Sequence, residues 1–195
     1  MDQRMTPTPF TPSQGRRLVR LARETLLSYF GQGEISILKE MENDPAYSSR
    51  QGTFVTLEIQ GNLRGCIGSL KARDTILKGI QENALNAAFH DFRFEQVTAQ
   101  ELERITIEVS ILTEPLALAF KNPEDLLNKL RPGIDGVILQ KGSAQATFLP
   151  QVWAQLSDPK EFLSHLCHKA GLPANAWREC KIGISTYQVQ HFKES

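Results

Sequence analysis

Residues 53–69 constrain the fold more strongly than any other part of the sequence. Thr53–Ile59 alternates, with Val55, Leu57 and Ile59 on one side, and Leu63–Ser69 continues as a second extended run. Gly61-Asn62 lies between them and is a typical turn dipeptide. The pattern predicts a β-hairpin whose second strand begins with the hexamer L-R-G-C-I-G.

Other elements follow from the spacing of apolar residues. Thr11, Pro12 and Gln14 form a capping-box pattern that predicts the start of a helix. Further elements are a helix after Asp74, a strand at Arg104–Leu112, a hairpin at Gly136–Leu149, a helix after Ser157 and a last strand within Lys181–Phe192. Because consecutive hairpins favour antiparallel pairing, we predict an α+β fold with a mainly antiparallel sheet packed with helices.

Composition narrows the class of protein. The chain has 22 basic and 22 acidic side chains, so no overall charge directs it toward nucleic acid or anionic lipid. No apolar run is long enough to cross a bilayer. Three cysteines are an odd and sparse set, which argues against a disulfide framework and favours a cytoplasmic protein. Residues 1–10 are expected to be a flexible leader, and residues 11–195 a single domain made of two intimately packed subdomains.

Cys66 is the residue on which the functional interpretation depends. We expect a two-residue or four-residue hairpin loop, which puts Cys66 and Arg64 on the face of Val55 and Leu57, whereas a three-residue loop would reverse this. On an apolar face a thiol behaves as a small hydrophobic group. Arg64 is costly on such a face unless it finds an acceptor or the face opens into a cleft.

The neighbouring glycines leave other roles open. Gly65 and Gly68 are poor strand formers and indicate a bulge or the close approach of another group. A thiol beside a guanidinium and exposed backbone N–H groups is also the environment of an activated nucleophile. Cys66 is therefore a candidate nucleophile, a residue lining a ligand or partner cleft, or a packing residue, and we favour the cleft.

A second cluster, His90-Asp91-Phe92-Arg93-Phe94, follows an alanine-rich helix. Asp91 and Arg93 can pair with each other, or one of them can hold a ligand. His90 would serve as a base for Cys66 only if the fold joins them, and a histidine at a helix end is more often a surface charge. No recognisable spacing completes a catalytic triad.

A metal site is not predicted. His165 and His168 share a helix face, but Cys167 points elsewhere and Cys180 lacks a C-x-x-C partner. Phosphate-binding loops, dinucleotide fingerprints and H-E-x-x-H motifs are missing from the sequence. We therefore predict no cofactor.

Several motifs together resemble the AMMECR domain family. They are G-T-F-V-T-L from Gly52, L-R-G-C-I-G from Leu63, D-x-R-F from Asp91 and E-V-S-I-L from Glu108. Segments within residues 133–172, including T-F-L-P-Q-V, extend the match over nearly the whole chain after the leader. Prokaryotic members are called AmmeMemoRadiSam system protein A, because they occur with a Memo-like protein and a radical SAM enzyme.

The resemblance implies an α+β fold of two β/α substructures with the hexamer lining the cleft between them. Arg64, Gly65, Cys66 and Gly68 match the hallmark hexamer. Asp91, Arg93 and Phe94 match the second motif, and Thr147 and Gln151 lie in the weaker T-F-L-P-Q-V match. We expect an accessory protein that binds a small ligand or a partner of the Memo-like or radical SAM kind. The alternative is an enzyme that uses Cys66 as a nucleophile or redox thiol.

Overall fold

The computed structural model describes residues 9–179 and 181–194. The expected leader, residues 1–10, lies outside this range except for its last two residues, and Phe10 is buried with its N–H donated to Gln190 Oε1 at 2.9 Å. The described residues form two compact units. We call residues 9–114 with 190–194 the N-terminal unit, and Pro115–Val189 the inserted unit.

The N-terminal unit is a four-stranded sheet in the order β2-β1-β3-β8. Its strands are β1 Gly52–Ile59, β2 Asn62–Ser69, β3 Ile105–Leu112 and β8 Val189–Lys193, and its helices are α1 Pro12–Tyr29, α2 Leu38–Glu42 and α3 Ile76–Phe89. Short 3₁₀ helices occupy Pro45–Tyr47 and Leu102–Arg104. The predicted first hairpin and the strand after residue 104 are confirmed.

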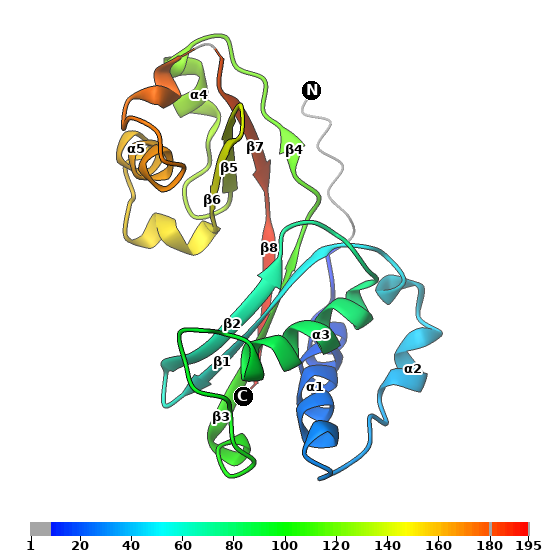
Figure 1. Cartoon of the computed structure of the whole chain (residues 1–195). Helices are drawn as coiled ribbons and strands as arrows, with labels where there is room; N and C mark the ends of the chain where they lie inside the picture. Colours follow the sequence, from blue (N-terminus) through cyan, green and yellow to red (C-terminus); the bar gives the residue numbers. More distant parts are fainter. Residues whose placement is uncertain (1–8, 180, 195) are drawn as a thin grey trace. The chain divides into compact units, whose positions relative to one another are not determined.

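Helices α1 and α3 lie side by side against one face of this sheet (Figure 1). The predicted capping box begins α1, because the Thr11 hydroxyl accepts from Gln14 N–H while the Gln14 side chain accepts from Thr11 N–H. Beneath the helices, Val55 and Leu57 of β1 are fully buried. The residues that alternate with them along β1, such as Thr56, point to the opposite face of the sheet. In Figure 1 no helix of this unit covers that face.

The inserted unit is a second four-stranded sheet, in the order β4-β7-β5-β6. Its elements are β4 Leu116–Ala117, α4 Pro123–Lys129, β5 Gly136–Lys141, β6 Ala144–Phe148, α5 Pro159–Lys169 and β7 Gly183–Tyr187, with 3₁₀ helices at Pro150–Ala154 and Ala176–Arg178. Trp153 stacks on Phe162 with ring centroids 3.7 Å apart, at the centre of a separate core. The second predicted hairpin is confirmed.

The fold is α+β with antiparallel sheets, as predicted. The single last strand expected within Lys181–Phe192 is wrong, because the segment divides into β7 and β8, which belong to different sheets. Among the described residues, none of the helices has the length and apolar character required to cross a bilayer.

Candidate functional site

A β-bulge decides which face of the sheet receives Cys66. Next to the turn, Glu58 pairs with Leu63, but Leu57 pairs with Gly65, so Arg64 is an extra residue on β2. Beyond the bulge the pairing is shifted by one residue, and Cys66 lies opposite Thr56. The expectation that Cys66 shares the face of Val55 and Leu57 is therefore wrong, since one inserted residue exchanges the faces.

The residue that does face the helices is Gly65. A methyl group at this position would lie 2.1 Å from the carbonyl oxygen of Ala87 on α3. Gly68 lies on the other face, where a methyl group would meet the Phe54 ring at 2.2 Å. Both glycines are thus required by close approach, as their weak strand propensity indicated.

Asp91 and Arg93 close the outer edge of β2 at Cys66. Asp91 Oδ2 accepts the Cys66 N–H at 2.9 Å, and Arg93 Nη2 donates to the Cys66 carbonyl oxygen at 3.3 Å. The two side chains also pair with each other, with Arg93 Nη2 2.7 Å from Asp91 Oδ2. The Arg93 guanidinium holds the pKa of the buried Asp91 carboxyl well below its usual range. The pair therefore provides hydrogen-bond partners for the outward-facing N–H and C=O of Cys66 on an edge strand.

Arg64 turns its guanidinium toward the loop before β3. Its Nε donates to Glu101 Oε1 at 2.8 Å, and its Nη1 and Nη2 donate to the carbonyl oxygens of Glu95 and Gln96 at 2.7 and 3.2 Å. The same Glu101 carboxylate accepts the N–H and hydroxyl of Thr98. Arg64 is the first cause of a lowered Glu101 pKa, about 2. Arg64 therefore finds its acceptors within the protein.

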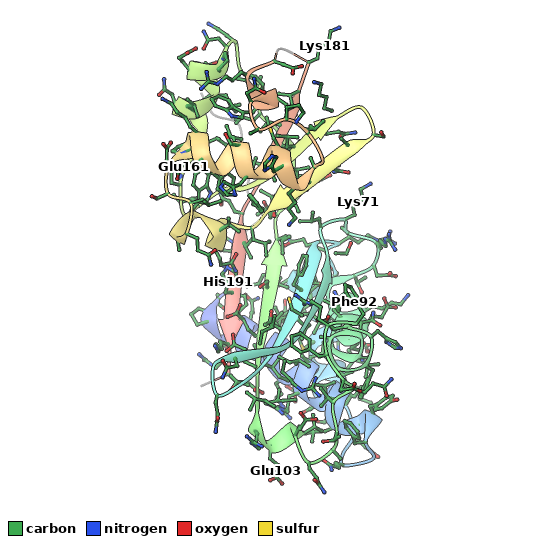
Figure 2. The ribbon with its side chains drawn as sticks, turned by 60° about the vertical axis from the view of Figure 1, so that its left-hand side comes forward. Lys71, Phe92, Glu103, Glu161, Lys181 and His191 are labelled. Carbon is green, nitrogen blue, oxygen red and sulfur yellow. The ribbon has the colours of Figure 1, made fainter. Side chains whose placement is uncertain are left out.

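We call Asp91, Arg93, Arg64 and Glu101 the edge clamp, because together they fasten the segment after α3 to β2. Phe92 lies between Asp91 and Arg93 in the sequence and beside α3 in Figure 2. Its side chain is 95% exposed. Its neighbours on both sides are fixed by hydrogen bonds. The clamp therefore holds a large apolar side chain in solvent.

The thiol of Cys66 lies on the sheet face opposite the helices, which we call the polar face. The Thr56 hydroxyl donates to Cys66 Sγ at 3.3 Å, and Thr56 is in turn the cross-strand partner of Glu108. Cys66 is neither fully buried nor fully exposed. The polar face thus presents a partly accessible thiol among hydroxyl and carboxylate groups.

A histidine completes the polar face on β8 (Figure 2). His191 Nδ1 lies 3.0 Å from Ser110 Oγ and 3.5 Å from Glu108 Oε1, and His191 is the first cause of a lowered Glu108 pKa. A catalytic triad needs the acid and the nucleophile on different ring nitrogens, whereas both groups here approach Nδ1. Since Thr56 and Glu108 separate Cys66 from β8 across two strands, His191 is not a direct base for the thiol.

The structure brings Gly65, Cys66, Asp91 and Arg93 together, but not His90. His90 Nδ1 lies 3.1 Å from Asn86 Oδ1, one turn back along α3. Sequence reasoning missed Glu101 as the partner of Arg64. The available signal is the T-A-Q-E spacing at Thr98–Glu101, which is typical of a capping box and by itself indicates a helix start, not a partner for Arg64.

The remaining candidates lie in the inserted unit. Thr147 Oγ1 is 3.0 Å from both the Val137 carbonyl oxygen and Tyr187 Oη, and burial raises the pKa of Tyr187 to about 12. Gln151 is exposed in the 3₁₀ helix after β6. These contacts belong to the packing of that unit's sheet.

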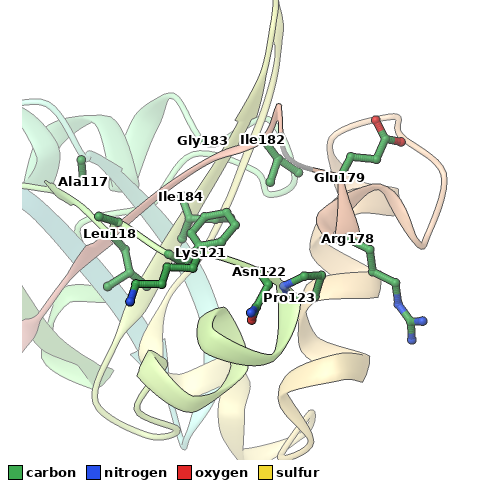
Figure 3. A pocket seen from close by; sticks show the side chains of 12 residues that line it. Ala117, Leu118, Lys121, Asn122, Pro123, Arg178, Glu179, Ile182, Gly183 and Ile184 are labelled. Carbon is green, nitrogen blue, oxygen red and sulfur yellow. The ribbon is translucent and has the colours of Figure 1, made fainter.

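The inserted unit also has a small pocket, of about 320 Å³. Figure 3 shows Leu118 and Ile184 on its lining and the Arg178 side chain directed away from them. This volume is at the lower end of the range for small-molecule sites.

Of the histidine and cysteine residues considered for a zinc site, those that the structure describes do not face a common point. Cys167 is fully buried, and burial raises the pKa of its thiol, while His165 and His168 are exposed. Cys180 lies outside the described residues. Within residues 9–179 and 181–194, no three His, Cys, Asp or Glu side chains are grouped for a metal ion.

Comparisons with known proteins find similarity over almost the whole chain. The AMMECR1 family model matches residues 19–192. A protein of Methanothermobacter thermautotrophicus is 36% identical over 97% of this chain and 99% of its own length, and Protein MJ0810 of Methanocaldococcus jannaschii is 35% identical over 94% and 92%. The crystal structure of the uncharacterized protein PH0010 from Pyrococcus horikoshii is similar, with a TM-score of 0.80 and 33% identity, covering 93% of this chain and 91% of that one.

Proposed function

The chain belongs to the AMMECR1 family, and from this premise we propose that it is an accessory protein that binds a protein partner through the edge clamp and the adjacent polar face. The observation that carries the proposal is Phe92, a 95% exposed aromatic side chain between two residues fixed by hydrogen bonds. Large exposed apolar side chains on a rigid support are typical of partner contacts. Because the clamp is already ordered, little conformational entropy is lost when a partner covers Phe92.

The partner classes are those that occur with the family, a Memo-like protein and a radical SAM enzyme. We propose one of these, rather than a small ligand, because Arg64, Asp91 and Arg93 already bind groups of this chain. Their charges therefore have acceptors and donors without a ligand. The proposal assumes the cytoplasmic compartment that the sparse cysteines favour.

The alternative function is an enzyme with Cys66 as nucleophile or redox thiol. The observation that favours it is the Thr56 hydroxyl, which donates to Cys66 Sγ and would stabilise a thiolate. A positioned base or acid is the second requirement of nucleophilic catalysis. The nearest histidine on the polar face, His191, instead contacts Ser110 and Glu108, so the binding role is better supported.

Binding to the purified Memo-like and radical SAM proteins from the same genome tests the proposal. We expect one of them to bind the wild type, and Phe92→Ala to weaken that binding about 30-fold, the usual effect of a hot-spot aromatic. Tyr29→Ala is the matched control, because Tyr29 is a second exposed aromatic residue, 60% exposed on α1. Equal binding by the wild type and Phe92→Ala, or binding of neither partner, would contradict the proposal.

A further inference from the structure

A groove of about 1080 Å³ runs between α1 and β8 in the N-terminal unit. From α1 it is lined by Arg16, Val19, Arg20 and Arg23, whose spacing places them on one side of the helix. On the other side it is lined by Gln190–Lys193 of β8 and by Glu194, which follows β8. The groove therefore has a helix along one wall and an edge strand along the other.

The strand beside the groove is an edge of the sheet whose backbone can pair further. The Glu194 N–H donates to the Ile107 carbonyl oxygen of β3 at 3.0 Å. Because backbone groups alternate along a strand, the N–H and C=O of Lys193 point away from β3. The opposite edge of the sheet, β2, differs, since Asp91 and Arg93 already bind its peptide groups at Cys66.

The floor of the groove is apolar and close to α1. Val19 and Ile105 line it and are 4% and 3% exposed. The Phe192 ring reaches α1 only because residue 15 is glycine, where a methyl group would lie 1.9 Å from the ring. Five consecutive residues, Gln190–Lys193 of β8 and Glu194 after it, border the groove, a length of about 16 Å for an extended chain.

The charge of the lining favours an acidic occupant. Four cationic side chains, Arg16, Arg20, Arg23 and Lys193, and two carboxylates, Glu103 and Glu194, line the groove. Arg23 is paired with Glu194, and Lys193 is paired with Glu58 outside the lining, so these two cations are already neutralised. The Arg16 side chain is exposed and makes no hydrogen bond or ion pair with the residues that the structure describes. Arg20 is bound to Glu24, yet its side chain is still 53% exposed. Arg16 is thus the cation with the most freedom to bind an added carboxylate.

We infer that this groove binds an extended acidic peptide segment of another protein, which adds to β8 as a fifth strand and pairs a carboxylate with Arg16. Strand addition is favoured over single-stranded nucleic acid because an outward-facing backbone edge matches another peptide backbone. Single-stranded nucleic acid instead needs aromatic platforms for its bases along a basic channel. The inference does not rest on the proposed function, since it concerns the groove and not the edge clamp.

Fluorescence anisotropy with labelled synthetic peptides tests the inference. The probe is an eight-residue alternating peptide, (Glu-Val)₄, which places carboxylates along one side of a strand and apolar groups along the other. We expect it to bind, (Lys-Val)₄ not to bind, and added salt to weaken the complex. Two further probes carry N-methyl groups on the glutamate residues or on the valine residues. One of these two probes should fail to bind, since N-methylation removes the N–H donors that pair with β8. No binding of (Glu-Val)₄, or equal binding of both N-methylated forms and the parent, would overturn the inference.

Protein variants locate the contact. Arg16→Glu should weaken binding about tenfold or more, because an opposite charge pair becomes a like-charge pair. Arg50→Glu is the control, since Arg50 is also exposed and the same change in net charge is made outside the groove. In wild type, the peptide should slow amide hydrogen exchange at Lys193. Equal losses of peptide affinity in the two variants would overturn the inference, and so would unchanged amide exchange at Lys193. It would also be overturned if oligo(U) bound more tightly than (Glu-Val)₄ and lost this binding in Arg16→Glu.

Discussion

At the scale of single residues, the hexamer is explained by how closely its backbone approaches its neighbours. Gly65 faces α3 and the Ala87 carbonyl, Arg64 leaves the strand as a bulge, and Cys66 is turned to the polar face. Each residue therefore has a different role, although the three are consecutive. The hexamer is mainly a structural device that presents one thiol.

Gly65→Ala should destabilise the protein. Its methyl group would lie 2.1 Å from the Ala87 carbonyl oxygen, so the strand or the helix must shift. We expect a loss of about 1–3 kcal/mol in the free energy of unfolding, as for other overpacked sites. Urea denaturation would measure it, with Gly33→Ala as the control because a methyl group there meets nothing within 4 Å. Equal stability of the two variants would show that the close approach is not maintained in solution.

Glu101 should make stability depend on pH in the acid range. Its pKa in the folded protein is about 2, below the ordinary 4.5, with Arg64 as the first cause. A carboxyl group with a lowered folded pKa adds stability above its unfolded pKa, and this stability is lost as the pH falls from about 4.5 toward 2. Glu101→Gln should therefore be less stable at neutral pH and lose less stability over that range.

Urea denaturation at a series of acid pH values would measure this difference. Glu34→Gln serves as the control, since Glu34 is exposed outside the clamp. A Glu101→Gln variant with the same pH dependence as the wild type would contradict the assigned pairing with Arg64.

At the scale of elements, the first hairpin illustrates what the sequence can and cannot predict. Alternation and the turn residue Gly61 located both strands to within one residue, because local sequence determines these features. The two turn residues are Gln60 and Gly61, both with positive φ, and the predicted turn residue Asn62 instead begins β2 opposite Ile59. The face of Cys66 was predicted wrongly, because a bulge at Arg64 depends on contacts with Glu95, Gln96 and Glu101, more than 30 residues away. Tertiary contacts of this kind leave no local signal beyond the neighbouring glycines.

The edge of β2 should depend on Asp91. Asp91→Asn removes the charge that binds Arg93 and accepts the Cys66 N–H, and we expect a loss of about 2–3 kcal/mol in unfolding free energy. Amide hydrogen exchange at Cys66 should also become faster. Asp74→Asn is the control, because the Asp74–Lys78 pair is exposed on the protein surface, where such ion pairs contribute little to stability. A Cys66 amide that exchanges at the wild-type rate in Asp91→Asn would contradict the clamp.

At the scale of the whole molecule, the chain leaves one core and later returns to it. The buried apolar residues of the N-terminal unit and those of the inserted unit form separate clusters. The sequence predicted the two hairpins and the main helices of both units, but it missed α2 and β4 and joined β7 and β8 into one strand. No local feature near Gln188 reveals that the chain passes from one sheet to another there.

Residues 115–189 alone should fold. They hold a four-stranded sheet, two helices and a core that includes Trp153 and Trp177, which are 3% and 2% exposed. Both tryptophans of the chain lie in this segment, so their fluorescence reports on it alone. We expect a cooperative urea transition in the isolated segment and an emission maximum typical of buried indole. Emission typical of solvent-exposed tryptophan without urea would contradict an independent core.

The central claim is that Cys66 is an accessible contact residue held in place by the edge clamp, without activation as a nucleophile. The rate at which iodoacetamide alkylates Cys66 in the native protein at neutral pH tests it most directly, with peptide mass spectrometry separating Cys66 from Cys167 and Cys180. We predict that Cys66 is modified in the folded protein, at a rate no higher than that of glutathione under the same conditions. Alkylation about tenfold or more faster than glutathione would contradict the claim by identifying an activated thiol. Protection until the protein unfolds would contradict it by showing that the thiol is sealed from any partner.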